Sequence, residues 1–184
     1  MKKIVKEIQS WSIAIIVGFV LSLVIGIFVI QPYKVDGFSM EPTLNNEQRI
    51  YAWKMNHTLN KLPEYGDIVI IDSRVDRDRT LMDDFMEHPI VNLLSGKKDD
   101  EIFYVKRVIG LPGDTIEVKD GNVFRNGEQL NEPYIKEAMD RGTDQVWEIP
   151  ENHVFVMGDN RNHSKDSRSI GPIPQDHVMG IDSF

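Results

Sequence analysis

Residues 101–130 read EIFYVKRVIGLPGDTIEVKDGNVFRNGEQL, and apolar side chains alternate with polar ones along much of this stretch. Its many β-branched and aromatic residues are typical of strands. Pro112 and Gly113 predict a turn. The Asp-Gly pair at 120–121 and the Asn-Gly pair at 126–127 are strong signals for tight hairpins. The stretch therefore predicts antiparallel strands joined by short turns.

Three further segments have the same composition and also predict strands: QRIYAWK (48–54), GDIVIIDS (66–73) and HVFVMGD (153–159). The chain ends in GIDSF, so we expect the last strand to be short. The predicted fold class is mainly β, with a folded antiparallel, barrel-like sheet as the core of the domain.

The segment at 74–100 interrupts this pattern, because it is charged at both ends and apolar in its middle. We expect a solvated excursion from the β domain that contains a short helix. Contact of its apolar middle with a membrane or a partner is the alternative.

The N-terminal part contains an uncharged apolar run, WSIAIIVGFVLSLVIGIFVI, at residues 11–30. At a rise of about 1.5 Å per residue, such a helix spans about 30 Å, the thickness of a bilayer's hydrocarbon core. The QPYKVDG that follows has no small-x-small cleavage site, which disfavours a cleaved signal peptide. A buried soluble helix would normally show a polar face. We therefore predict a transmembrane helix at 11–30.

Lysines before this run predict its orientation in the membrane. Lys2, Lys3 and Lys6 precede it, and the positive-inside rule places such residues in the cytoplasm. The expected organisation is a cytoplasmic N-terminus at 1–10 and an extracytoplasmic domain at 31–184. The chain is then a single-pass protein of the cell membrane, in contact with the lipid bilayer.

Charge and composition exclude several classes of function. Residues 1–34 carry four lysines and one glutamate, a charge of +3, so the remaining 150 residues carry −11 of a formal total of −8. So acidic a domain disfavours nucleic acid as a partner. The absence of cysteine excludes disulfides and thiol catalysis. The histidines lack the spacing of a zinc site, and we expect neither a metal nor a cofactor.

The segment GFSMEPTL at 37–44 places Ser39 in a turn shortly after the apolar run. A nucleophilic serine needs a base, which is histidine or, in a known variant, lysine. Lys106 lies in the predicted strand at 101–110, and alternation puts it on one face with Tyr104 and Val108. Apolar surroundings lower the pKa of a lysine, so a neutral Lys106 is a candidate base.

One alternative remains open for this strand. Arg107 does not serve as a base, because guanidinium stays protonated in proteins. Lys106 and Arg107 together are also compatible with an edge strand whose basic side chains reach solvent. Alternation places Ile102 on the face of Lys106, and it places Phe103, Val105, Arg107 and Ile109 on the other face.

A polar block, MGDNRNHSKDSRSIGPI, follows the strand predicted at 153–159 and occupies residues 157–173. Polar groups packed against a core need partners. Asp159 and Asp166 are suited to accept hydrogen bonds from Arg107, Arg161 or Arg168. An ordinary surface loop is the alternative interpretation.

Three segments, in their order along the chain, resemble the motifs of the type I signal peptidases: GFSMEPTL (37–44), YVKRVIGLPGD (104–114) and GDNRNHSKDSR (158–168). The single N-terminal span is similar to the short Gram-positive form of that family. The segment at 74–100 looks longer than in many Gram-positive members. The resemblance implies a membrane-bound serine endopeptidase with a Ser-Lys dyad. Its substrates are secretory preproteins, cut after small-x-small sites, and we expect a monomer.

The resemblance also implies roles for individual residues. Ser39 is the acylating nucleophile and Lys106 the general base, with the backbone N–H of Ser39 in the oxyanion hole. Gly37 stands where Gram-negative members have a serine hydroxyl as a further oxyanion donor. Supporting roles fall to Ser164, as a hydrogen-bond partner of the lysine, to the pair Asp166 and Arg168, and to the pair Asp159 and Arg107. The residues that match the substrate pockets are Tyr33, Val35, Met40, Leu44 and Val105.

Two other classes of function compete with this interpretation. One is a self-cleaving Ser-Lys repressor, which the apolar span and the absence of a helix-turn-helix region disfavour. The other is a membrane-anchored β binding module, in which GFSMEPTL is only a turn and the pocket residues are ordinary core.

Overall fold

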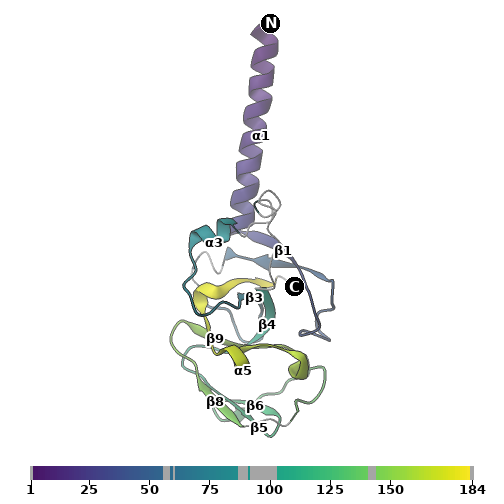
Figure 1. Ribbon diagram of the computed structural model, residues 1–184, viewed down its shortest axis with the longest axis vertical. Helices are drawn as coiled ribbons and strands as arrows, with labels where there is room; N and C mark the ends of the chain where they lie inside the picture. Colours follow the sequence, from purple (N-terminus) through teal and green to yellow (C-terminus); the bar gives the residue numbers. More distant parts are fainter. Residues whose placement is uncertain are drawn as a thin grey trace.

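The computed structural model describes residues 2–55, 59, 61–86, 91, 103–140 and 144–182. A long helix, α1 (Lys2–Phe28), extends away from a β domain that holds nearly all the rest of the described chain (Figure 1). The helix has a mean hydropathy of 2.6 in its most apolar window, and none of that window is buried. Its length and composition are therefore sufficient to cross a bilayer.

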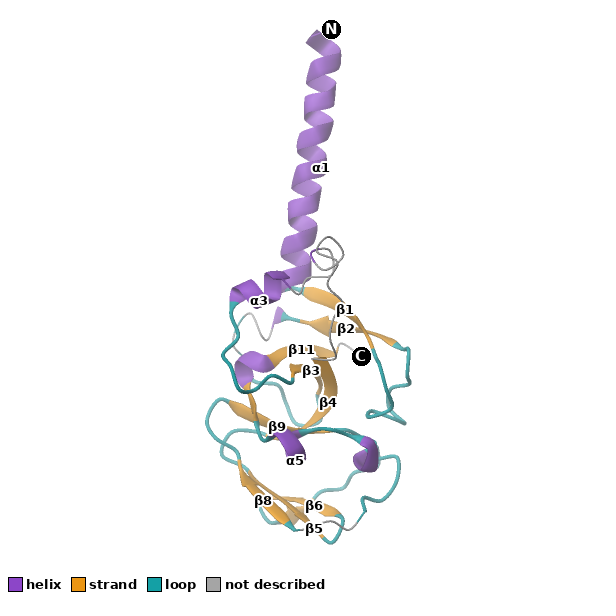
Figure 2. Ribbon diagram, viewed as in Figure 1, coloured by secondary structure: helices purple, strands orange, loops and turns teal. Residues whose placement is uncertain are grey.

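Two antiparallel sheets make up the β domain, which confirms the predicted fold class. Among the described residues the larger sheet has seven strands in the order β1-β2-β11-β3-β4-β9-β10, and it is curled (Figure 2). These strands are β1 (Ile30–Lys34), β2 (Arg49–Trp53), β11 (Val178–Asp182), β3 (Ile68–Asp72), β4 (Phe103–Gly110), β9 (His153–Met157) and β10 (Ile173–Pro174). The smaller sheet has four, in the order β7 (Glu128–Gln129), β6 (Asn122–Arg125), β5 (Thr115–Lys119) and β8 (Gln145–Glu148).

The predicted strands and hairpins lie where the composition placed them. The Asp-Gly turn joins β5 to β6, and Asp120 and Gly121 both have positive φ, as such turns require. The Asn-Gly turn joins β6 to β7 in the same way. The structure differs at the C-terminal end, because β11 is five residues long and pairs with both β2 and β3. The expectation of a short last strand was therefore wrong.

Three strands were not expected from the sequence: β1, β8 and the two-residue β10, which begins at the last residue of the block at 157–173. Ile30 is the first residue of β1 and pairs with Trp53, so the helix ends at Phe28, before the predicted end of the span at residue 30. The helix also starts at Lys2, well before the apolar run. β8 is a mostly exposed edge strand, and it lacks the buried side of the alternation by which strands are recognised.

The core forms on both faces of β3 and β4. We call the apolar cluster on one face the first cluster, and its buried members are Val35, Met40, Leu44, Ile50, Ala52, Ile70 and Met179. It contains Ile70, with Phe103 and Val105 packed against it, while Val108 belongs to the cluster on the opposite face and Tyr104 packs there. The predicted alternation along β4 is thus confirmed for these residues; Ile102 lies outside the described residues. A third cluster, which includes Ile116 and Phe155, joins the two sheets.

The excursion at 74–100 is described only in part. A short helix, α3 (Leu81–Met86), occupies its apolar middle, as expected, and Figure 1 shows it at the level at which α1 meets the domain. The segments 87–90 and 92–100 lie outside the described residues. The remaining short helices are η1 (Arg161–His163), α5 (Ser167–Ile170) and η2 (Gln175–His177).

Candidate active site

The structure brings together Ser39 and Lys106. Lys106 Nζ lies 2.8 Å from Ser39 Oγ, within hydrogen-bond distance, and donates to the carbonyl oxygen of Val105 at 2.9 Å. Lys106 lies on β4, a strand hydrogen-bonded on both sides, to β3 and β9. Ser39 lies in the loop between β1 and β2. The sheet therefore fixes the amine, and a turn presents the hydroxyl to it.

The residue Lys106 is only 3% exposed, and this burial strongly affects the pKa of its amine. Desolvation lowers its pKa from 10.5 to about 8, against the nearby carboxylates Asp166 and Asp159, which raise it. Arg168 adds to the lowering. The ring of Tyr104 lies 5.2 Å from Nζ on the same face of the strand. A substantial fraction of this lysine is therefore neutral at mildly alkaline pH.

The loop that carries Ser39 is held at both of its flanks. Asn160 donates its backbone N–H to the carbonyl of Ser39 at 3.0 Å, and its side-chain amide donates to the carbonyl of Phe38 at 3.0 Å. On the other side, Met40 and Leu44 are buried in the first cluster. The loop is therefore held by the hydrogen bonds from Asn160 on one side of Ser39 and by the apolar packing of Met40 and Leu44 on the other. Asn160, which we call the clamp residue, was not singled out from the sequence.

A buried ion pair links β4 to the segment that follows β9, and the loop that carries Ser39 joins this pair through Thr43. Arg107 donates twice to Asp159, at 2.9 and 2.7 Å, and Asp159 is fully buried. Such bidentate pairing fixes geometry as well as charge. Thr43, near the end of the GFSMEPTL segment, donates to Asp159 at 2.5 Å. The pair expected between Arg107 and Asp159 is present, and Thr43 is a further member that the sequence did not reveal.

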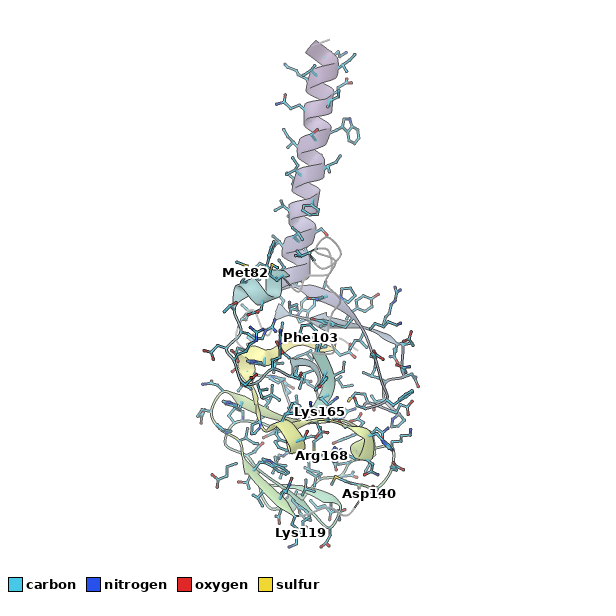
Figure 3. The ribbon with its side chains drawn as sticks, viewed as in Figure 1. Met82, Phe103, Lys119, Asp140, Lys165 and Arg168 are labelled. Carbon is cyan, nitrogen blue, oxygen red and sulfur yellow. The ribbon has the colours of Figure 1, made fainter. Side chains whose placement is uncertain are left out.

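A second pair braces the loop after β9. Arg168 donates to both oxygens of Asp166, each at 2.8 Å, and it also donates to the carbonyl of Arg161 (Figure 3 labels Arg168). The backbone N–H of Gly158 donates to Asp166 at 3.0 Å. Burial acts to raise the pKa of Asp166, but the contacts with Arg168 and Gly158 outweigh it, and the pKa lies below its usual value. The carboxylate stays ionised.

The structure differs from the expectation at Ser164. Its Oγ is buried and forms no hydrogen bond of good geometry among the described residues, Lys106 included. The amine of Lys106 is directed at Ser39 and Val105, whereas Ser164 Oγ packs closely over Gly158. The hydroxyl thus lies at the site, without the contact to the lysine that the resemblance implies.

The five expected pocket residues all belong to, or pack against, the first cluster. Val35, Met40 and Leu44 are buried there, while Tyr33 and Val105 are half-buried at its margin. The three buried residues fit an ordinary core as well as the floor of a pocket. Tyr33 and Val105, which pack against the cluster that contains Met40, keep part of their apolar surface exposed.

An open groove lies on the other side of the nucleophile. It has a volume of about 470 Å³ and is lined by Phe38, Glu41, Lys136, Asn160 and His163. None of these residues was expected from the sequence to have a role in binding, although all but Lys136 lie inside the GFSMEPTL and GDNRNHSKDSR segments. Within the described part of the chain, no three His, Cys, Asp or Glu side chains gather in a way that would hold a metal ion.

Comparison with known proteins gives consistent matches. A family model described as signal peptidase, peptidase S26, matches residues 8–184. Signal peptidase I S of Bacillus subtilis (strain 168) is 35% identical over 97% of this chain and 89% of its own length. Signal peptidase I of Bacillus licheniformis is 37% identical, with coverages of 95% and 86%. Signal peptidase IB of Staphylococcus aureus (strain COL) is 34% identical, with coverages of 97% and 89%.

Among solved structures, a signal peptidase I from Enterococcus faecalis V583 is 27% identical and matches 66% of this chain and 97% of that chain, with a TM-score of 0.46. The family model spans nearly the whole chain, and the Bacillus and Staphylococcus relatives exceed 30% identity over most of it. The chain therefore belongs to the type I signal peptidases of peptidase family S26, serine endopeptidases that remove signal peptides from exported preproteins.

Proposed function

We propose that this chain cuts preproteins through an acyl-enzyme formed on Ser39, with Lys106 as the general base. The observation that carries the proposal is the 2.8 Å contact between Ser39 Oγ and the buried amine of Lys106. Neutral Lys106 takes the hydroxyl proton as Oγ attacks the scissile carbonyl carbon. A tetrahedral intermediate forms, with the negative charge on the former carbonyl oxygen.

The same lysine completes both halves of the reaction. Protonated Lys106 gives its proton to the leaving amine as the C–N bond breaks, and the signal peptide remains as an ester on Ser39. Water then enters, Lys106 takes one of its protons, and the hydroxide attacks the ester carbonyl. Collapse of this second intermediate returns the proton to Oγ and releases the signal peptide with a free carboxylate.

The oxyanion is expected to lie near the backbone N–H of Ser39. Gly37, two residues before Ser39, has a φ of 96°, a conformation that favours glycine, and apart from its chain neighbours no atom of the described residues lies within 4 Å of where its Cβ would be. The N–H of Gly37 is already bonded to Asn46 at 2.9 Å. The local backbone therefore supports the N–H of Ser39 as the primary donor in the oxyanion hole.

The apolar surface on the side of Ser39 that faces the first cluster supports cleavage after small residues. Tyr33 and Val105 form its partly open wall, and Val35, Met40 and Leu44 fill the space behind them. A shallow apolar site of this kind accepts alanine and rejects large or charged side chains. We assign the residues on the acyl side of the cut to this pocket.

Membrane topology is the remaining part of the proposal. We assign α1 as the transmembrane span, with the N-terminus in the cytoplasm and the β domain outside, acting as a monomer. The support is the unburied apolar length of α1 together with the lysines that precede the run at 11–30. Ser39 then stands close to the outer surface, where the cleavage sites of membrane-inserted preproteins emerge.

One experiment tests the function directly. The detergent-solubilised full chain is incubated with a preprotein, and the product is identified by N-terminal sequencing, beside Ser39→Ala and Lys106→Ala. Cleavage after a small-x-small site by the wild type alone is expected, with circular dichroism showing that both variants are folded. Appreciable turnover by either folded variant excludes the dyad. Covalent labelling of Ser39 by a serine-acylating probe separates the enzyme from the binding module.

A further inference from the structure

The mechanism above uses only one side of Ser39, and the groove on its other side is left without a role. Phe38 and Met40 flank the nucleophile in sequence but lie in opposite surroundings. Met40 is 1% exposed within the first cluster, whereas Phe38 is 57% exposed and lines the groove. A polypeptide that crosses Ser39 therefore meets the apolar pocket on one flank and the groove on the other.

An ion pair crosses one wall of this groove. Lys136 Nζ lies 2.5 Å from the carboxylate of Glu41, and both side chains keep part of their surface in solvent. Glu41 belongs to the segment that carries the nucleophile, whereas Lys136 comes from the loop between β7 and β8. The two charges therefore face a ligand in the groove from two separate parts of the chain.

The loop that carries Lys136 is firmly attached to the site. The backbone N–H of Lys136 donates to the carbonyl of Asp159 at 3.1 Å. Nearby, Glu132 accepts two hydrogen bonds from the buried Arg161, at 2.8 and 2.6 Å. The groove wall is thus fixed with respect to the catalytic residues, as a specificity site requires.

We propose that this groove receives the first residues of the leaving polypeptide, the start of the mature protein, and that the pair Glu41–Lys136 sets its charge preference. The proposal rests on the function proposed above, which places the acyl side of the cut in the first cluster. With both partners present the pair carries no net charge. The wild type therefore cuts substrates that have acidic or basic residues in the groove at similar rates. Removing or inverting one partner leaves a net charge beside the substrate.

The test uses two preproteins that differ only at the first two positions after the cut, which are either lysine or glutamate. The measured quantity is the ratio of kcat/KM for the lysine substrate to that for the glutamate substrate. Lys136→Glu should raise this ratio and Glu41→Lys should lower it, each by about 5-fold, because partly exposed charges interact weakly. The double exchange restores an opposite-charge pair and should return the ratio to near the wild-type value.

Lys119→Glu is the matched control, since it makes the same change of charge on an exposed residue of β5 that does not line the groove (Figure 3 labels Lys119). Its ratio should equal that of the wild type. The proposal is overturned if Lys136→Glu and Glu41→Lys leave the ratio unchanged, or if Lys119→Glu changes it equally. If one of the two variants does not fold, the other carries the same test with the opposite sign. A wild type that cuts neither substrate contradicts the proposed function instead.

Discussion

The carbonyl oxygen of Ser39 lies only 2.5 Å from the point at which a Cβ of Gly158 would stand, and Ser164 Oγ lies against the same point. The end of β9 therefore touches the backbone of the nucleophile loop with no room for a side chain between them. The neighbouring hydrogen bond from Asn160 to Ser39 depends on this approach. Gly158 thus helps to position Ser39 beside Lys106.

Gly158→Ala should therefore push the nucleophile loop away from β4. We expect kcat/KM to fall by more than about 10-fold, because misplacing a reacting group by a fraction of an ångström already slows catalysis. Overpacking should also lower stability by about 1–3 kcal/mol. Gly110→Ala is the control, since its Cβ meets the side chain of Ile116 instead. The control should lose stability and keep its turnover; a fully active Gly158→Ala contradicts this account.

Thr43 is expected to be a positioning residue, through its hydrogen bond to Asp159. Thr43→Val keeps the shape of the side chain and removes the hydroxyl. We expect a lower kcat with little change in KM, and a loss of stability of about 2–3 kcal/mol, because the hydroxyl donates to the carboxylate of Asp159 and accepts from Arg107. Thr43→Ser should restore kcat. A purely structural role would instead lower the melting temperature of Thr43→Val with kcat unchanged.

Asp166 is expected to hold the loop together without taking part in proton transfer. Asp166→Ala leaves Arg168 without its partner, a carboxylate that is 1% exposed, which costs on the order of 3–5 kcal/mol. Melting temperature and turnover should fall together. Because the folded pKa of Asp166 is depressed, the stability from this carboxylate is present above the unfolded value of 3.8. It is lost as the pH falls through the folded pKa. Lost turnover with an unchanged melting temperature would show a direct catalytic role.

Lys106 should destabilise the fold at neutral pH, because its pKa is 10.5 in the unfolded chain and about 8 in the folded one. Below pH 8 both states are protonated, and the folded state bears a desolvation cost on the order of 3 kcal/mol, at about 1.4 kcal/mol per pKa unit. Between pH 8 and 10.5 the unfolded state binds more protons, so stability rises with pH.

Lys106→Met removes this charge and retains an apolar side chain of similar length. It should melt at a higher temperature than the wild type at pH 7, less the contribution of the lost hydrogen bond to Val105, about 1 kcal/mol. The difference should shrink as the pH rises toward 10.5. A variant that is less stable at pH 7, or whose advantage does not depend on pH, contradicts the assigned pKa.

Local chemistry explains which parts of the fold were predictable. The hairpins follow from Asp-Gly and Asn-Gly pairs, whose conformational preference is independent of the rest of the chain. β1 was missed because its first residue, Ile30, continues the apolar run, and only pairing with Trp53 turns it into a strand. β8 was missed because an exposed edge strand shows little alternation.

The candidate active site likewise contains residues that local patterns predicted and residues that they did not. Ser39 and Lys106 were candidates from residue type, strand alternation and the order of three motifs. The clamp from Asn160 and the groove wall formed by Lys136 arise from contacts between distant segments, which no local pattern encodes. The hydroxyl of Ser164 shows the limit of transfer by resemblance, since its position is near the site but its hydrogen bond depends on side-chain packing.

The central claim is that Lys106 is the base, and the pH dependence of kcat/KM for one preprotein tests it most directly. The rate should rise with pH through a single ionisation near 8, as Lys106 loses its proton. The controls are single alanine variants of the histidines, whose ordinary pKa of about 6.5 lies close enough to imitate such a limb: His57, His88, His153, His163 and His177. The account predicts the same limb near pH 8 in the wild type and all of these variants. A limb near 6.5 that disappears with one histidine would contradict it and assign the base to that residue.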